Sequence, residues 1–357
     1  MLRTALIIFL SQLATALGSD DNKINVFVPS FGGDSFGQNV GTIFNLQVLR
    51  TLRIPQNAHG GSAPGGKVFF LPNPFSEFTH SEVERVSKDL SVQLTLWGNA
   101  LPFGKSTAVQ SYLTIPYYKD LRPQRLEEWS EEVPNDSGAT KITVDLPRRR
   151  YEFSPILLDQ AFVEKYRTPS ALKLYEGKGR GEFVGIVGPN FTALRYEGRF
   201  AYVSRDEDHR KGWLELPDVE NDKEIVNFVG GLVRLMRGDY PGAIDLFKTI
   251  SASEAPHAVK IDALLLGATA KAKLGQDPRD DIDQALALNP YQQSTIKFKV
   301  LAVIREYRNA ETALQKSKIA QKLTQILDEK SYLFSSNDPW LAQAKSIETA
   351  IKNPQQH

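Results

Sequence analysis

The sequence contains no cysteine, and this absence excludes three kinds of chemistry. Without a thiol the chain cannot carry a lipid on a lipoprotein cysteine, form a disulfide or use a thiolate as a nucleophile. Extracellular eukaryotic proteins of this size usually carry disulfides, because their compartment is oxidising. The absence therefore favours the bacterial periplasm or exterior over a eukaryotic secretory route.

An excess of charge of either sign is missing as well. The 43 lysines and arginines are balanced by 42 aspartates and glutamates, which leaves a formal net charge of +1. No overall field steers such a chain toward nucleic acid or an anionic membrane, so we expect no nucleic-acid partner. The run Arg148-Arg149-Arg150 follows a strand-like segment and is interpreted as a solvated strand end.

Long apolar runs are absent too. No segment approaches the ~20 apolar residues of a membrane-spanning helix. A short apolar stretch from Ala5 to about Leu10 follows Arg3 and precedes small residues at positions 14, 16 and 18. This pattern predicts that residues 1–18 are a cleaved signal peptide, with an uncleaved anchor as the alternative. The mature protein is then expected in the periplasm or outside the cell, without an integral membrane span.

Motifs for catalysis or cofactor binding are also missing. The histidines at 59, 80, 209, 257 and 357 have no metal-ligand spacing, and no G-x-S-x-G elbow occurs. Gly32, Gly33 and Gly37 precede a helical pattern, but they lack both the Walker lysine and the Rossmann glycine spacing. We therefore predict a protein without catalytic residues, cofactor or metal. A hydrolase with an unrecognised site in the amino-terminal domain is one alternative.

A chain of 357 residues is long enough for two or three domains, and the patterns predict a multidomain α+β protein. Residues 22–118 alternate strand and helix patterns as β-α-β-α-β-β, which predicts an α/β sandwich. This order resembles the amino-terminal domain of TolB and CsgG-like domains of envelope proteins. Residues 119–165 are polar and rich in turns, and they are interpreted as a linker with two strands, 141–147 and 150–158.

Residues 166–218 alternate short β-rich runs with glycine-rich or charged turns. Five such runs predict a small antiparallel barrel, and the segments "ALRYEGRFAYVSR" and "GWLEL" resemble bacterial SH3-like domains. The resemblance implies binding of peptidoglycan or peptides through aromatic side chains on the barrel surface, although such side chains more often form the core or rim of a barrel. The candidates are Tyr175, Tyr196, Tyr202 and Trp213.

Residues 220–352 show helical periodicity with small residues at regular positions. Apolar residues from Ile225 to Met236 form one stripe, and "GDYPGAIDLF" at 238–247 supplies a turn followed by a second helix. The pattern recurs, with Gly231 and Gly267 lying 36 residues apart, close to the ~34-residue period of tetratricopeptide repeats. The segment resembles that family, which implies an α-solenoid of helix hairpins.

Solenoids of this family bind peptides or proteins on the face formed by the first helix of each pair. The basic set that clamps a peptide carboxylate is missing, and an apolar groove could hold a partner helix or the protein's own capping helix. We therefore predict a non-catalytic adaptor in an envelope assembly, with a peptidoglycan-binding protein acting through the barrel as the second alternative. The residues predicted to line the partner-binding face are Phe228, Leu232, Leu235, Leu264, Ala268 and Lys271.

Overall fold

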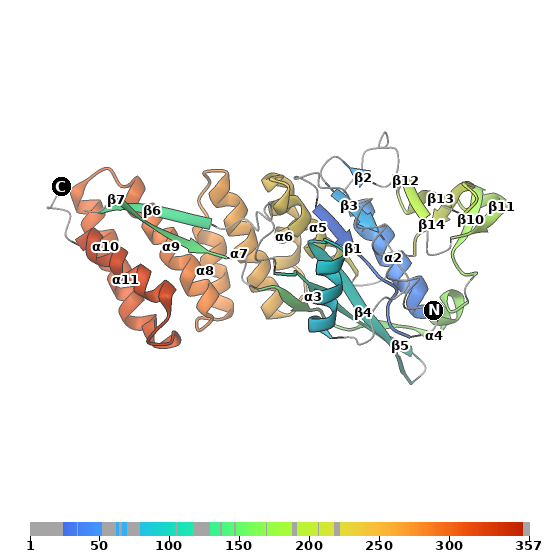
Figure 1. The fold of residues 1–357 in the computed structure, drawn as a ribbon, viewed down its shortest axis with the longest axis horizontal. Helices are drawn as coiled ribbons and strands as arrows, with labels where there is room; N and C mark the ends of the chain where they lie inside the picture. Colours follow the sequence, from blue (N-terminus) through green and yellow to red (C-terminus); the bar gives the residue numbers. More distant parts are fainter. Residues whose placement is uncertain are drawn as a thin grey trace. The chain divides into compact units, whose positions relative to one another are not determined.

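The computed structural model divides the chain into two compact units, each made of two chain segments (Figure 1). Unit 1 comprises residues 1–124 and 149–239, and unit 2 comprises residues 125–148 and 240–357. The predicted signal peptide lies outside the described residues. The structure describes residues 24–33, 35–51, 62–63, 66–69, 79–104, 106–117, 129–135, 138–145, 148–168, 170–187, 191–205, 207–217 and 222–352.

A seven-stranded mixed sheet forms the centre of unit 1, in the order β2-β3-β1-β4-β5-β8, with β9 also pairing with β5. β1 pairs in parallel with β3 and β4, whereas β4 pairs antiparallel with β5. This order contains the predicted alternation of strands and helices. The strands are β1 (Ile24–Phe27), β2 (Ser62–Ala63), β3 (Gly66–Phe69), β4 (Leu94–Phe103), β5 (Ser106–Thr114), β8 (Arg150–Glu152) and β9 (Ile156–Leu158).

Two predicted helices are present in unit 1, α2 (Ser35–Thr51) and α3 (His80–Asp89). α3 begins as the sequence predicts, because the Thr79 hydroxyl accepts a hydrogen bond from the Glu82 N–H at 3.2 Å. The predicted apolar side of α2, from Val40 to Val48, is buried. Its polar side is buried too, and there Asn39 donates to the Tyr166 carbonyl at 2.7 Å. α2 is therefore an internal helix, which its amphipathic pattern did not indicate.

The five strands predicted between residues 166 and 218 form one antiparallel sheet in the order β11-β10-β14-β13-β12. The sheet belongs to unit 1. It is linked to α2 by Gln47, whose side chain donates a hydrogen bond at 3.2 Å to the carbonyl of Pro217, just after the last strand. The elements of this region are α4 (Gln160–Tyr166), β10 (Lys173–Gly177), β11 (Arg180–Ile186), β12 (Phe191–Glu197), β13 (Phe200–Arg205) and β14 (Lys211–Glu215).

The predicted helical region is divided between the two units at Asp239. Its first helix, α5 (Asp222–Met236), belongs to unit 1 and packs against α2. The ring of Phe228 contacts Tyr151 and Phe153, with centroid distances of 4.7 and 5.7 Å. The remaining helices belong to unit 2: α6 (Tyr240–Ser251), α7 (His257–Lys273), α8 (Arg279–Leu288), α9 (Gln293–Asn309), α10 (Ala313–Lys330) and α11 (Pro339–Lys352).

Unit 2 also contains a β-hairpin from the predicted linker, formed by β6 (Trp129–Asn135) and β7 (Gly138–Val144). The linker strand predicted at 141–147 overlaps β7 over residues 141–144, and the one predicted at 150–158 divides into β8 and β9 of the large sheet. The predicted linker is therefore no spacer between domains. It supplies strands to both units, because its apolar residues need a buried face that its own short hairpin cannot provide.

Gly98 in β4 allows the closest approach in the large sheet. A Cβ atom at this position would lie 2.2 Å from the Gln110 carbonyl oxygen and 2.6 Å from the Phe31 ring. Gly98→Ala should therefore destabilise unit 1 by about 2 kcal/mol or more, because neither the paired strand nor the buried ring can move away. Hydrogen exchange of β4 and β5 amides measures the loss.

Gly104→Ala in the turn after β4 serves as the matched control. No heavy atom lies within 4 Å of its added Cβ, so only the strain of its positive φ of +60° remains, which costs about 1 kcal/mol. Equal effects of the two substitutions would contradict the close packing at Gly98.

Candidate functional site

The residues predicted to line a partner-binding face are almost all buried. Phe228, Leu232 and Leu235 belong to α5 and are completely inaccessible within unit 1. Leu264 and Ala268 belong to the core of unit 2, and the ammonium of Lys271 pairs with Asp281 at 2.8 Å. In this structure the apolar side chains of the predicted face pack inside their units and leave little or no surface for a partner. The apolar stripe that suggested the face is the packing stripe of the core.

The aromatic side chains predicted on the barrel surface are likewise largely covered. Trp213 is buried, and its indole ring lies under the guanidinium of Arg195 at 4.8 Å and the ammonium of Lys178 at 5.2 Å. Tyr202 packs on Trp213 with a centroid distance of 5.0 Å, and the Tyr196 hydroxyl is inaccessible. Tyr175 is half-buried against Phe183. These rings pack on one another and on cations, and they do not form an open aromatic platform.

The β6–β7 hairpin covers one face of the helices in unit 2. Its strands contact α7, α9 and α11, and Trp129, Val133, Ile142 and Val144 join the same hydrophobic core as these helices. The alternate side chains of the hairpin are exposed or half-buried. Period-two alternation therefore places one face of the hairpin against the helices, and that helix face already holds an extended chain.

Glu131 interrupts the apolar face of the hairpin with a buried carboxylate. It is 3% exposed, accepts a hydrogen bond from the Trp129 indole at 2.8 Å, and pairs with Arg308 of α9 at 2.8 Å. The Arg305 guanidinium lies 4.0 Å away and also donates to the Ala272 carbonyl of α7. A buried carboxylate is tolerated only where it is paired, so this contact sets which residue of the hairpin faces α9.

A second ion pair of reversed polarity holds the other end of the same segment. Arg148 donates to the Asp262 carboxylate of α7 at 2.7 Å and to the Ala258 carbonyl at 2.9 Å. Asp262 is completely buried, and Gln292 also approaches it at 3.5 Å. Burial raises the pKa of the Asp262 carboxyl to about 6, although Arg148 opposes the rise. Arg148, interpreted from the sequence as part of a solvated strand end, is thus a structural residue of unit 2.

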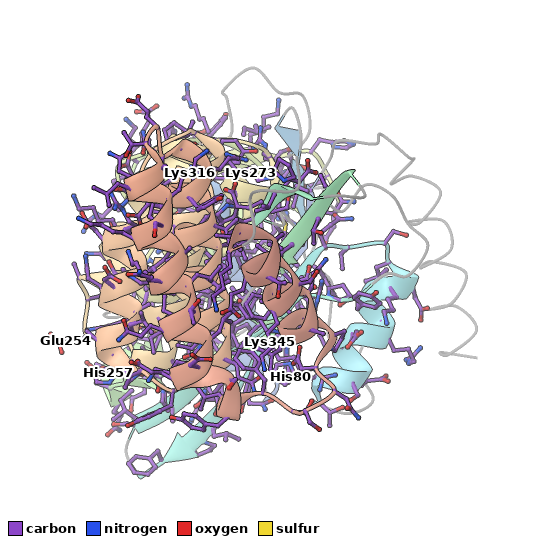
Figure 2. The ribbon with its side chains drawn as sticks, turned by 90° about the vertical axis from the view of Figure 1, so that its left-hand side faces the viewer. His80, Glu254, His257, Lys273, Lys316 and Lys345 are labelled. Atoms are coloured by element: carbon purple, nitrogen blue, oxygen red, sulfur yellow. The ribbon has the colours of Figure 1, made fainter. Side chains whose placement is uncertain are left out.

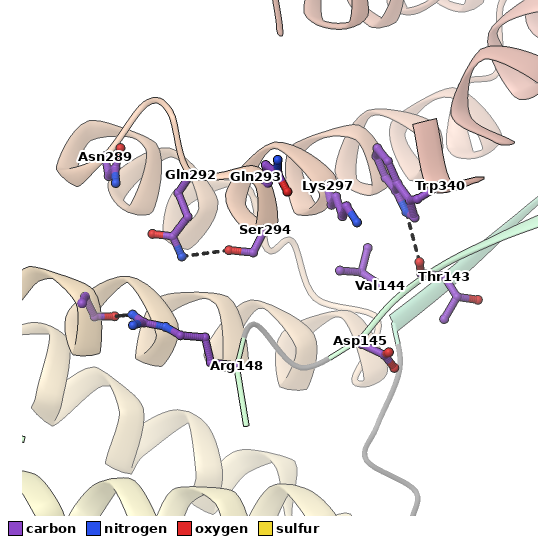
Figure 3. Close-up of a pocket in the computed structure, with 11 residues that line it drawn as sticks. Thr143, Val144, Asp145, Arg148, Asn289, Gln292, Gln293, Ser294, Lys297 and Trp340 are labelled. Atoms are coloured by element: carbon purple, nitrogen blue, oxygen red, sulfur yellow. Dashed lines mark hydrogen bonds between the residues drawn. The ribbon is translucent and has the colours of Figure 1, made fainter. Parts of the chain in front are cut away.

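A cavity of about 1000 Å³ lies between β7, α7, α9 and α11, beside this segment. Figure 3 shows Gln292 and Lys297 reaching from α9 toward the segment that carries Val144 and Arg148. Trp340 closes one side, where its indole N–H donates to the Thr143 carbonyl at 3.1 Å. Carboxamide and hydroxyl groups dominate the lining, and each can donate and accept hydrogen bonds. These polar residues are Thr143, Asn289, Gln292, Gln293 and Ser294.

Lys297 brings a cation to this cavity. Its ammonium lies 5.2 Å from the centre of the Trp340 ring and 5.7 Å from that of Phe334, and these two rings stack on each other. Within the described part of the chain, no carboxylate lies within ion-pair distance of Lys297. Its half-buried neighbour Lys299 is paired with Asp283. The cavity therefore presents hydrogen-bonding amides beside the Lys297 cation, and the charged side chains of Arg148 and Asp145 line it as well.

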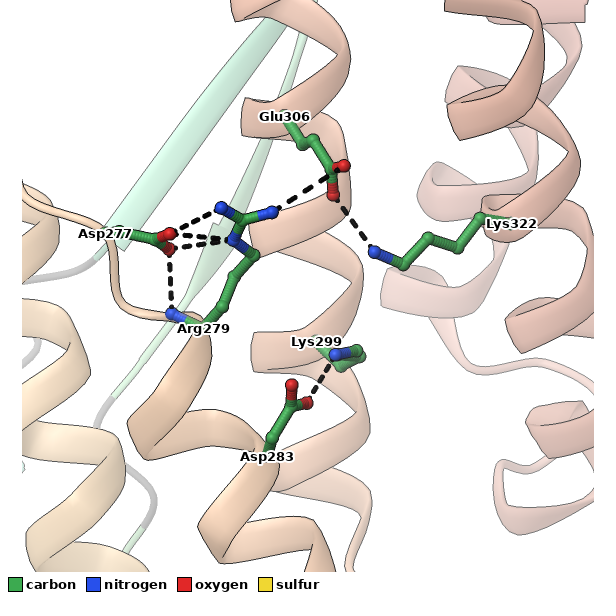
Figure 4. A network of polar contacts seen from close by, with 6 residues as sticks. All are labelled: Asp277, Arg279, Asp283, Lys299, Glu306 and Lys322. Carbon is green, nitrogen blue, oxygen red and sulfur yellow. Dashed lines mark hydrogen bonds and ion pairs between the residues drawn. The ribbon is translucent and has the colours of Figure 1, made fainter. Parts of the chain in front are cut away.

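Other polar clusters of unit 2 are satisfied internally. Asp277 accepts three hydrogen bonds from the Arg279 side chain. The Arg279 guanidinium lies 3.7 Å from Glu306, and Lys322 of α10 pairs with Glu306 at 3.0 Å (Figure 4). This network links the α7–α8 turn to α9 and α10. A separate, more apolar cavity of about 820 Å³ lies between α10 and α11, beside Lys316 and Ile351.

The α/β part of unit 1 contains one histidine with several close partners. His80 hydrogen-bonds Thr114 at 2.8 Å and packs edge-on against Trp97 and Tyr112 (Figure 2). Burial lowers the pKa of its imidazole, and the nearby charge of Arg150 lowers it further. Thr114 is inaccessible and also accepts a hydrogen bond from the Trp97 indole. This arrangement is that of a half-buried histidine packed at the edge of the core.

Among the residues that the structure describes, no group of three or more acidic, histidine or cysteine side chains could hold a metal ion. In the same part of the chain, no helix is long and apolar enough to cross a bilayer. Comparison of the chain with protein-family models, with curated proteins and with solved structures finds no match.

The cavity could not be found from the sequence. Its lining comes from residues 143–145 and 148 of the predicted linker and from distant residues of the predicted helical region, among them 258, 289, 297 and 340. One feature of the sequence pointed to this region: Glu131 and Arg148 stand among alternating apolar residues. Charged residues in such a pattern are buried only with partners elsewhere in the fold.

The raised pKa of Asp262 predicts a pH dependence of the stability of unit 2. Because the folded-state pKa of about 6 lies above the ordinary aspartate pKa of 3.8, this group's contribution to stability is fully present below pH ~4 and is lost as the pH rises through ~6. Between these pH values the free energy of unfolding of the wild type should therefore fall by on the order of 3 kcal/mol more than that of Asp262→Asn. Calorimetric unfolding of both proteins across this range measures the difference, and parallel pH profiles would contradict it.

Glu131 and Glu132 provide a matched pair on opposite faces of the hairpin. Glu131→Ala should lower the free energy of opening of the hairpin by about 3 kcal/mol, because it leaves the Arg305 and Arg308 charges without their shared carboxylate. Glu132 is exposed, so Glu132→Ala should change stability by less than about 0.5 kcal/mol. Hydrogen exchange of residues 129–144 measures both effects, and equal protection in the two variants would show that the buried pair does not hold the hairpin.

Proposed function

We propose that the protein is a non-catalytic adaptor whose helical unit binds an extended peptide segment of a protein partner. The observation that carries this proposal is the cavity beside the hairpin. The face of α7, α9 and α11 already holds an extended chain in cis, and the cavity continues that face with open, polar space. The predicted location in the periplasm or outside the cell, within an envelope assembly, remains part of the proposal.

The chemistry of the cavity fits a peptide backbone. A carboxamide carries two donor hydrogens and an accepting oxygen, and Asn289, Gln292 and Gln293 line the cavity. Gln292 donates to Ser294 and Gln293 donates to the Leu333 carbonyl, so the side-chain oxygens of these two residues are the groups that would accept from a peptide N–H. Lys297 adds a cation that favours a partner segment with an acidic group nearby. The binding face thus lies beside the predicted apolar stripe, not on it.

We further propose that the helices form a tetratricopeptide-like array. α5, α7 and α9 begin at Asp222, His257 and Gln293, which are 35 and 36 residues apart. α5 and α7 also end alike. Each is followed by a glycine with positive φ, Gly238 at 75° and Gly275 at 77°. The backbone N–H of each glycine donates to the carbonyl three residues earlier, and the N–H of the residue after it donates to the carbonyl five residues earlier. This repetition of one C-terminal motif supports an internal repeat.

Two finer assignments complete the proposal. The antiparallel order of β10 to β14 supports an SH3-like sheet that closes into a small barrel. The parallel arrangement of β3, β1 and β4 with α2 and α3 supports the TolB-like and CsgG-like assignment of the first part of unit 1.

Charge reversal at Lys297 tests the peptide site. Peptides selected on the wild-type protein from a phage-displayed random library should bind Lys297→Glu at least tenfold more weakly, because the reversed charge repels an acidic group and disturbs the amide lining. Lys316→Glu is the matched control, since the Lys316 ammonium also lies over an aromatic ring, that of Tyr307 at 5.7 Å, but outside this cavity. Fluorescence anisotropy of labelled peptides measures both affinities.

Two results would count against the site. One is a failure of the selection to enrich any peptide, and the other is an equal loss of affinity in both lysine variants. Weaker binding by Lys316→Glu alone would move the site to the cavity between α10 and α11.

A further inference from the structure

The tip of the β4–β5 hairpin in unit 1 carries a cluster of exposed apolar side chains. Leu101 and Phe103 at the end of β4 are 56% and 66% exposed, and Leu157 of β9 is 63% exposed. The strand register places Leu101 opposite Ala108 of β5, and Ala108 opposite Leu157. The apolar side chains therefore lie next to one another across three adjacent strands, and they do not form scattered surface positions.

This cluster continues a face of the sheet that is covered elsewhere. Trp97 of β4 and Tyr112 of β5 lie opposite each other and pack in the cluster that holds Val83 and Val86 of α3. Leu101 and Phe103 follow Trp97 at even spacing, so they point to the same face. Over Trp97 this face is buried beneath α3, and at the tip it is open to solvent.

The tip is held rigidly from behind. Ala100, Val109 and Ile156 point to the opposite face of the same strands and are at most 7% exposed. Backbone pairing continues to the last residues of the hairpin, with Pro102 opposite Thr107 and Phe103 opposite Ser106. The apolar cluster is therefore a permanent feature of the folded unit.

Two observations indicate what this tip contacts. Pro102 is exposed on the opposite face of β4, so an exposed apolar side chain lies on each side of the hairpin end, and a lipid environment can cover both sides at once. The backbone groups of the tip are paired within the hairpin, and Pro102 has no N–H, so few polar backbone groups would lose water in an apolar medium. Both properties suit a lipid environment that surrounds the tip.

We infer that the β4–β5 hairpin tip inserts into the interfacial region of a lipid bilayer and attaches the protein peripherally to a membrane. Leu and Phe side chains bind this region by burying apolar area at the boundary between headgroups and acyl chains. This inference uses no residue of the peptide cavity, so each proposal can fail without the other.

The absence of cysteine permits a local test in the full chain. A single cysteine is introduced as Ser106→Cys at the tip or as Leu314→Cys in unit 2, where Leu314 is 68% exposed, and each is labelled with the environment-sensitive dye NBD. Vesicles of phosphatidylethanolamine with phosphatidylglycerol, and of phosphatidylcholine alone, are then added. We expect emission from the tip label to shift to the blue and to rise at least twofold on both kinds of vesicle, with no change at position 314.

Substitution of the apolar side chains provides the second arm. In the Ser106→Cys background, Leu101→Ser with Phe103→Ser should abolish the response while circular dichroism and the melting temperature stay unchanged, because both side chains point into solvent. No response of the tip label, or an equal response after these substitutions, would overturn the inference. A blue shift of the tip label's emission when the protein concentration is raised without vesicles would also overturn the inference, because a second copy of the chain would then cover the tip.

Discussion

Unit 2 depends on the burial of one face of the β6–β7 hairpin against its helices. An isolated two-stranded hairpin is marginally stable in water, and this one gains its stability from Trp129, Val133 and Ile142 within the helical core. Two ion pairs of opposite polarity hold the segment, since Glu131 meets arginines of α9 and Arg148 meets Asp262 of α7. Apolar burial supplies the affinity of the hairpin for the helices, and the charges set its register, because a shift by one residue would leave Glu131 unpaired.

The same hairpin explains why the candidate peptide site lies where it does. The hairpin covers the apolar part of the face of α7, α9 and α11, so the surface left open beside it is polar. The apolar face predicted to bind a partner is thus covered by other segments of the protein itself. A partner segment would meet amides and Lys297 at the border between β7 and α9, where hydrogen bonds and charge, more than apolar area, decide which partner binds.

The two proposed surfaces differ in chemistry and lie in different units. The hairpin tip of unit 1 offers apolar side chains on a rigid sheet, which suits lipid, and the cavity of unit 2 offers hydrogen-bonding groups, which suits a peptide. A protein with both surfaces could hold a partner close to a membrane. Each surface consists of side chains whose backbone is fixed by buried neighbours, Ala100 and Val109 at the tip and Thr295 and Ile296 beside the cavity, so both are preformed.

Local patterns in the sequence determined most of the secondary structure, including the five short strands between residues 166 and 218, the cap of α3 at Thr79 and the helices from α5 to α11. These features depend on neighbouring residues, whose periodicity and turn chemistry are visible in the chain. Only the tertiary structure decided that the β6–β7 hairpin and Arg148 pack on helices more than a hundred residues away, that α5 belongs with α2, and that the apolar stripe of α5 faces a core and not a partner. Periodicity shows that a face is apolar, but what covers that face depends on contacts between distant segments, which a single sequence does not specify.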